Sequence, residues 1–320
     1  MNSSEKPLIS ILLALYEPSL DWLRALLLSL NEQTYPNLNL RVRDDGSSEA
    51  SFAASSQLIE STITAFPYTV VQNEKNMGSN KTFELLTEEA DGAYLAYCDQ
   101  DDLWLPEKLT VLQQTLEREN AGLACSDVIM IDENGDKLAD SITELRPRHV
   151  FRSGRDLAGG LANHNFVIGC TMLIRREIAQ ASLPFAENMV HDHYLAFFCA
   201  RKYAIAVADK PLVQYRQHGG NQTGVLAHIQ TKTDYKERYV RPYCRRIEEL
   251  QARFPGDIPA ETVRWAEARE ANIDCKPHGM RMLFALRRFN RSAAWFELAA
   301  LRFPEPLFRY AVRLVQRGKM

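Results

Sequence analysis

An apolar segment that ends in three carboxylates reads Ala93-Tyr94-Leu95-Ala96-Tyr97-Cys98-Asp99-Gln100-Asp101-Asp102. Carboxylates this close repel one another, so a counter-charge is expected, and their oxygens suit Mg²⁺ or Mn²⁺. A hard cation held by one or two protein carboxylates usually takes its other ligands from substrate phosphates and water. The segment therefore predicts a metal-dependent site for a phosphorylated substrate. The alternative is a solvated acidic turn that caps the next helix.

Short apolar runs alternate with helical segments on both sides of this stretch. The predicted strands are 8–16, 38–43, 68–72 and 93–98, and the predicted helices are 20–33, 52–65, 79–90 and 106–119. This alternation predicts a largely parallel sheet covered on both faces. Ligands of such sheets bind beyond the carboxyl ends of the strands. Tyr16, Asp45 and residues 99–102 all follow strands, so we expect them to converge.

The pattern changes along the rest of the chain. Further strands are predicted at 123–131, 165–175 and 211–215, with a hairpin turn at 132–136 and a helix at 188–202. From about residue 226 there are only polar helical segments, near 228–254, 260–273, 278–289, 292–302 and 306–317. We therefore expect an α/β domain over 1–225 and a C-terminal helical region over 226–320.

The composition narrows the class of protein. The chain is 46% hydrophobic and 25% charged, as is usual for globular proteins. Its six cysteines form no CxxC pair, which favours a reducing compartment and argues against zinc or a disulfide scaffold. We identify no signal peptide, and no apolar run approaches the ~18 residues that a membrane span needs. A cytoplasmic location is expected.

Charge is distributed unevenly along the chain. Residues 281–320 carry a net charge of +7, so the other residues carry −10. A basic tail on an acidic body suggests an anionic surface as partner. Nucleic-acid binding is not expected, because the body of the chain is acidic and the excess of basic residues lies in one tail.

Two motifs follow the early strands. Asp45, in Asp44-Asp45-Gly46-Ser47, can accept hydrogen bonds from a nucleoside base or ribose, or can simply cap a helix and shape a turn. Gly78 and Lys81, within residues 76–81, can bring backbone and a cation close to a substrate. The alternative for that segment is an ordinary helix start.

Two motifs in the later half complete the candidate chemistry. Asp192 opens an apolar helix, where it can act as a general base or merely complement the helix dipole. The flanking histidines do not form a zinc pattern. Arg216 can neutralise a diphosphate and His218 can complete a metal shell, unless they belong to an ordinary charged loop.

In chain order these motifs resemble those of the family 2 glycosyltransferases, which have the GT-A fold. The motifs are residues 10–17, 42–47, 76–78, 98–109, 191–192 and 215–224. The resemblance covers about residues 7–224 and is nearest to the bacterial branch that makes O-antigen and capsule polysaccharides, including many rhamnosyltransferases. It implies a GT-A type nucleotide-diphospho-sugar transferase fold, with a mostly parallel central sheet, flanking helices and a C-terminal helical region.

The resemblance also implies roles in catalysis. Asp101 matches the metal-binding residue of the Asp-x-Asp signature, and Asp99 and Asp102 support it directly or through water. The cofactor would be Mn²⁺ or Mg²⁺. Asp192 matches the catalytic base of an inverting mechanism.

Further roles implied by the resemblance concern the nucleotide sugar. Tyr16 would lie near the nucleotide base, and Asp45 would contact the base or ribose. His218 and Arg216 match a loop that closes over the diphosphate. The donor would be a dTDP- or UDP-sugar, with dTDP-rhamnose favoured by resemblance. The acceptor would be a saccharide, often one linked to polyprenyl diphosphate.

Two other functions stay open. A sugar nucleotidyltransferase also needs a metal and an α/β nucleotide site, but it would be expected to show a Gly-rich, basic phosphate loop near the first strand, and 12–20 has none. A non-catalytic glycan-binding protein of the same fold is the other alternative, and the intact carboxylates argue against it.

The C-terminal segment 278–320 mixes aromatic and aliphatic residues with arginines. Such a pattern suits the surface of an anionic membrane. It would place the protein peripherally on the inner face of the cytoplasmic membrane. Helices that pack on the core with their arginines in solvent are the alternative.

Overall fold

The computed structural model describes residues 6–219 and 229–316 of the chain. The chain divides into two compact units, one of residues 1–185 and 189–218 and the other of residues 186–188 and 219–320. The predicted domain boundary at 225 and the second half of the 215–224 motif lie outside the described residues. The two units are described separately below.

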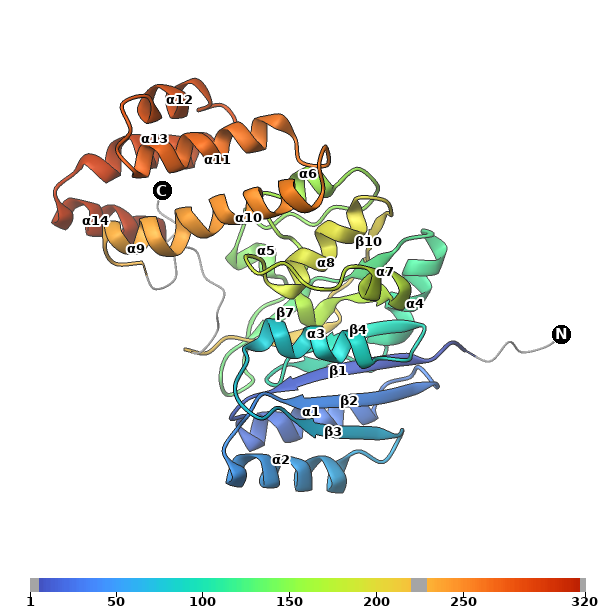
Figure 1. Ribbon diagram of the computed structural model, residues 1–320. Helices are drawn as coiled ribbons and strands as arrows, with labels where there is room; N and C mark the ends of the chain where they lie inside the picture. The colour runs from blue at the N-terminus through green and yellow to red at the C-terminus, as the bar shows by residue number, and fades with distance from the viewer. Residues whose placement is uncertain (1–5, 220–228, 317–320) are drawn as a thin grey trace. The chain divides into compact units, whose positions relative to one another are not determined.

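The first unit contains a seven-stranded sheet in the order β10-β6-β9-β4-β1-β2-β3, of which β4, β1, β2 and β3 can be followed in Figure 1. Its strands are β1 (Ile9–Leu15), β2 (Leu38–Asp44), β3 (Tyr68–Gln72), β4 (Tyr94–Cys98), β6 (Leu123–Cys125), β9 (Leu173–Arg175) and β10 (Ile205–Val207). All neighbouring pairs are parallel except those that β9 makes with β4 and β6. The predicted, mostly parallel sheet is therefore confirmed.

Helices of the first unit pack around its strands. They are α1 (Leu20–Asn31), α2 (Glu49–Thr62), α3 (Ser79–Glu89), α4 (Lys108–Arg118) and α8 (His191–Ala200), with short helices α5 (Ile142–Leu145), α6 (Ala158–Leu161) and α7 (Arg176–Ala181). The apolar stripe of α1 is buried as its spacing predicts, because Leu23, Leu26, Leu27 and Leu30 share one face.

Two predicted strands are wrong in detail. Residues 123–131 form two strands that belong to different sheets, β6 and β7 (Val128–Ile131), rather than one. The break falls at Asp127, whose Oδ1 accepts hydrogen bonds from the backbone N–H groups of Val128 and Ile142 and so redirects the chain. In the predicted strand 165–175, only β9 is extended, because a 3₁₀ turn (Gly169–Thr171) precedes it.

A second, four-stranded sheet has the order β5-β11-β7-β8. Its other strands are β5 (Leu103–Trp104), β8 (Lys137–Ala139) and β11 (Val213–Arg216). The predicted turn at 132–136 does join an antiparallel hairpin, β7–β8, with Gly135 at φ 91°. β11 pairs with β5. The residues at the carboxyl end of β11 therefore lie next to the acidic residues that precede β5.

The described part of the second unit, residues 186–188, 219 and 229–316, is helical and contains no strand. Its elements are α9 (Lys232–Tyr235), a π-helical turn (Lys236–Val240), α10 (Arg241–Arg253), α11 (Ala260–Ile273), α12 (Gly279–Ala285), α13 (Arg291–Ala299), a 3₁₀ turn (Ala300–Arg302) and α14 (Glu305–Gln316). A buried ion pair joins α11 to α13, with Arg269 Nη2 2.5 Å from Glu297 Oε1. Among the described residues, no helix is both long and apolar enough to cross a bilayer.

Candidate functional site

The acidic loop, residues 99–102, leaves the carboxyl end of β4 and runs into β5. Asp102 is fully buried, and its Oδ1 accepts a 2.9 Å hydrogen bond from the backbone N–H of Arg216. Asp101 instead lies 2.6 Å from His218 Nε2, with both side chains about one-fifth exposed (20% and 19%). The loop thus divides into a buried carboxylate and an accessible Asp101–His218 pair.

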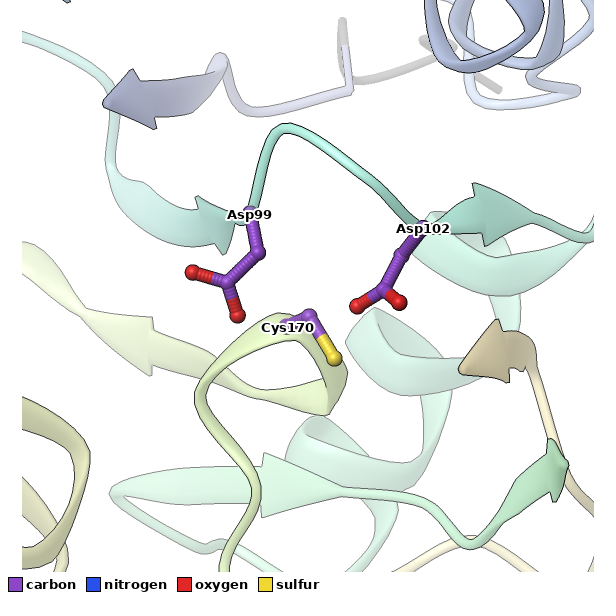
Figure 2. Close-up of side chains that lie close together, drawn as sticks. All are labelled: Asp99, Asp102 and Cys170. Carbon is purple, nitrogen blue, oxygen red and sulfur yellow. The ribbon is translucent and has the colours of Figure 1, made fainter. Parts of the chain in front are cut away.

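Asp99 and Asp102 also face Cys170 of the 3₁₀ turn (Figure 2). One ligand atom from each of the three residues lies within 4.8 Å of the others. Burial, reinforced by the Asp101 charge, raises the pKa of Asp99 to about 7 and that of Asp102 well above its ordinary value. Both carboxyls are therefore poorly charged unless a cation lies close to them.

The donor groups present fit a hard divalent cation. Asp102 Oδ2 is buried and has no hydrogen-bond partner among the described residues. A buried carboxylate oxygen without a partner is costly, and a cation would satisfy it. Burial raises the pKa of the Cys170 thiol well above its usual range, so the oxygens and the His218 nitrogen are the ligands to expect.

Lys108 is a member of the site to which the sequence reasoning gave no role. It is fully buried, donates a 2.7 Å hydrogen bond from Nζ to the carbonyl of Cys170, and lies over the ring of Trp104. Burial lowers the pKa of Lys108 to about 7, while the nearby carboxylates Asp102 and Asp99 oppose this shift. The only sequence signal was its place in the 98–109 motif.

Arg216 joins the acidic loop to the β7–β8 hairpin. Its Nε donates to the carbonyl of Asp101 at 2.9 Å, and its Nη1 donates to the carbonyls of Asp132 and Glu133 at 3.1 Å each. Trp22 lies beside both Arg216 and His218, with its ring centroid 5.2 Å from the guanidinium carbon and 4.9 Å from the imidazole centroid. The predicted contact of Arg216 with a diphosphate remains a prediction.

Asp192 stands in the first turn of α8, as the sequence predicts. Its Oδ2 accepts a 3.1 Å hydrogen bond from the backbone N–H of Gly169, and its Oδ1 accepts one of 2.5 Å from that of His193. Burial raises the pKa of Asp192 to about 6. The negative charge of Asp192 helps to raise the pKa of Asp99. Asp192, the candidate base, therefore lies near the acidic loop.

The two histidines beside Asp192 have separate surroundings. His191 is packed against Phe83 and Tyr97, with ring centroids 4.1 and 5.3 Å away. Burial lowers the pKa of His191 to about 3, so the imidazole is neutral. His193 Nε2 lies 2.5 Å from the carbonyl of Leu161. Both rings thus belong to the packing that positions the start of α8.

Gly169→Ala is expected to reduce turnover about tenfold or more by moving the Asp192 carboxylate. A Cβ at position 169 would lie 3.0 Å from His191 Nε2 and 3.4 Å from Asp192 Cβ. Steady-state turnover of the variant would be compared with that of Gly160→Ala, since a Cβ at position 160 meets no atom within 4 Å. Equal turnover of the two variants would contradict this positioning role.

At the other end of the site, Asp45 holds the loop that precedes α3. Its carboxylate accepts hydrogen bonds from the backbone N–H groups of Met77 and Gly78, each at 2.8 Å, and from Asn73 Nδ2 at 2.9 Å. Gly78 has φ 86°, which suits glycine. Lys81, in the first turn of α3, pairs with Glu84. The roles predicted for these residues toward a nucleotide remain predictions.

Tyr16 follows β1 and is 48% exposed. Its backbone is joined to the acidic loop through Gln100, because Tyr16 N–H donates to Gln100 Oε1 at 2.9 Å and Gln100 Nε2 donates to the Tyr16 carbonyl at 3.2 Å. Gln100, to which the sequence reasoning gave no role, therefore links the ends of β1 and β4.

Residues 10–183 match the family described as Glycosyl transferase family 2. The chain is 27% identical over 230 residues to dTDP-rhamnosyl transferase RfbG of Shigella flexneri, which covers 67% of this chain and 74% of that protein. It is 22% identical over 264 residues to the uncharacterized glycosyltransferase YibD of Escherichia coli (strain K12), which covers 81% of this chain and 74% of that protein.

Among solved structures, S. aureus TarS 1-349 in complex with UDP-GlcNAc has a TM-score of 0.60 at 15% identity, covering 97% of this chain and 92% of that chain. At this identity the likeness shows the fold alone. The fold is therefore of the GT-A type, as the sequence predicts. Because the family match spans more than half of the chain, the protein belongs to glycosyl transferase family 2.

Proposed function

We propose that this glycosyltransferase moves a sugar from a nucleoside diphosphate to a saccharide hydroxyl with inversion at the anomeric carbon. The observation that carries the proposal is the position of Asp192, whose Oδ2 accepts a hydrogen bond from Gly169, the residue before the Cys170 that faces Asp99 and Asp102. A base beside a phosphate-binding loop suits a single displacement. The printed names of RfbG and TarS, which mention dTDP-rhamnosyl transfer and UDP-GlcNAc, support a nucleotide-sugar donor.

Asp101, Asp102 and His218 would hold Mn²⁺ or Mg²⁺, with Asp99 in support. Such an ion would offset the negative charge of the departing diphosphate. The rest of the chemistry belongs to the chain's own residues. Asp192 accepts the acceptor hydroxyl proton as the new bond to the anomeric carbon forms and the bond to the diphosphate oxygen breaks. The nucleoside diphosphate leaves with the bonding electron pair.

The donor we favour is a dTDP- or UDP-sugar, with dTDP-rhamnose first because of the relationship to RfbG. The acceptor we favour is a saccharide linked to polyprenyl diphosphate, in the synthesis of a bacterial surface polysaccharide such as O-antigen. Such an acceptor would require the enzyme to work in the cytoplasm, at the inner face of the membrane.

The test is a thermal-shift screen of UDP-, dTDP- and GDP-sugars with and without Mn²⁺, followed by hydrolysis of the stabilising donor. One nucleotide is expected to raise the melting temperature, and to do so more with Mn²⁺. The anomeric configuration of the product, read by NMR, tests inversion. Release of pyrophosphate from a nucleoside triphosphate and a sugar phosphate would instead establish the nucleotidyltransferase, and retention of configuration would sink the single displacement.

A further inference from the structure

An exposed aromatic cluster lies on two helices of the second unit. Met280 and Phe284 are one turn apart on α12 and Trp295 is on α13, with exposed fractions of 47%, 47% and 48%. The rings of Phe284 and Trp295 meet edge to face, with centroids 6.0 Å apart. These three residues and the arginines described next are called the α12–α13 face.

The segment that forms this face has no negative charge of its own. Residues 279–296 include four arginines and no acidic residue. Arg281, Arg288 and Arg291 are exposed, and Arg287 lies over the Phe284 ring with its guanidinium carbon 4.2 Å from the centroid. None of the four forms an ion pair with any residue in the described part of the chain. The face therefore carries about four positive charges.

The next acidic residue along the chain does not reduce this charge. Glu297 is fully buried and accepts hydrogen bonds from Arg269 Nε at 2.8 Å and from the Tyr235 hydroxyl at 2.9 Å. Its charge is balanced inside the unit by Arg269. Exposed arginines and half-exposed aromatic rings thus occur together on α12, on α13 and in the turn between them.

We propose that the α12–α13 face binds the surface of an anionic lipid bilayer, a step that rests on the proposed lipid-linked acceptor. Tryptophan and phenylalanine rings settle at the headgroup level, and arginines are attracted to anionic headgroups. Self-association through this face is disfavoured, because a two-fold contact would place four positive charges against four more. The membrane contact proposed here is limited to α12 and α13, whereas the sequence pattern predicted it for the whole segment 278–320.

Flotation of the full-length chain with vesicles tests the proposal. Binding is expected to vesicles of phosphatidylcholine mixed with phosphatidylglycerol, not to phosphatidylcholine alone, and to be lost in 1 M NaCl, where the Debye length is about 3 Å. Arg288→Gln with Arg291→Gln should weaken partitioning about 25-fold, because each arginine near an anionic surface contributes about fivefold. Trp295→Ala should weaken it about tenfold.

The controls remove equal charge and aromatic surface from the first unit. They are Arg118→Gln with Lys137→Gln, both side chains being 59% exposed, and Tyr203→Ala, at 42% exposed. These should bind like wild type. Equal binding by the α12–α13 variants, binding without anionic lipid, or no binding by wild type would overturn the proposal. Nucleotide-sugar stabilisation is measured on the same samples, so failure of the proposed function is seen separately.

Discussion

Asp192→Asn is expected to lower turnover by about 10²–10⁴-fold while donor binding stays within a few fold of wild type. The substitution removes the proton acceptor but keeps the size of the side chain. The amide oxygen can still accept a hydrogen bond from the backbone N–H of Gly169 or of His193. A loss of this size with an intact melting temperature would therefore report the missing base rather than a damaged fold.

The measurement is steady-state transfer at saturating donor, with donor affinity obtained from the thermal shift. Asp209→Asn is the matched control, because Asp209 is exposed. Turnover of Asp192→Asn within a few fold of wild type would show that another group takes the proton. A large rise in the donor dissociation constant would instead assign Asp192 to donor binding.

The same residue predicts the pH dependence of the reaction. Burial raises the pKa of Asp192 to about 6, above its ordinary value near 4. A base acts in its deprotonated form, so activity should reach its plateau about one pH unit above the pKa, be half-maximal near pH 6 and fall further as the pH drops below 6. The pH profile of turnover should show this acidic limb in wild type and lose it in Asp192→Asn.

The convergence of the strand ends could be predicted from sequence because it follows from the alternation of strands and helices along the chain. β1, β2 and β4 are parallel neighbours, so Tyr16, Asp45 and the acidic loop emerge at one edge of the sheet. The region around β9, the antiparallel strand of the sheet, was harder to predict. Residues 165–175 look like one apolar strand, but the 3₁₀ turn that carries Gly169 and Cys170 is stabilised by tertiary contacts that local spacing does not encode.

The parts of the site that sequence reasoning missed depend on long-range contacts. Lys108 reads as one of many lysines at a helix start, and only the fold shows that it is buried against the carbonyl of Cys170. Gln100 has no predicted role, and only the fold shows that its side-chain amide contacts the backbone of Tyr16. Asp101 and His218 were both predicted, but only the pairing of β11 with β5 brings them together.

Asp101→Ala is expected to abolish stimulation by Mn²⁺ and to cut turnover at least about 100-fold. Asp101 is accessible and already lies 2.6 Å from the His218 imidazole, so both side chains can turn to a shared ion. Removing its charge also lowers the pKa of Asp99 and Asp102, which Asp101 helps to raise. The remaining carboxylates would be better ionised, yet they would lack the accessible ligand.

Stabilisation by MnCl₂ alone, turnover after EDTA treatment, and recovery on adding Mn²⁺ back would be measured on wild type, Asp101→Ala, His218→Ala and Asp140→Ala. Asp140 is the control, because its side chain is 73% exposed and pairs only with Lys137 among the ion pairs described. Wild type and the control should lose activity with EDTA and regain it with Mn²⁺, whereas the two site variants should respond to neither. Undiminished wild-type turnover in EDTA would overturn the metal assignment. The positive charge that offsets the acidic loop would then come from Lys108, which is buried close to Asp99 and Asp102.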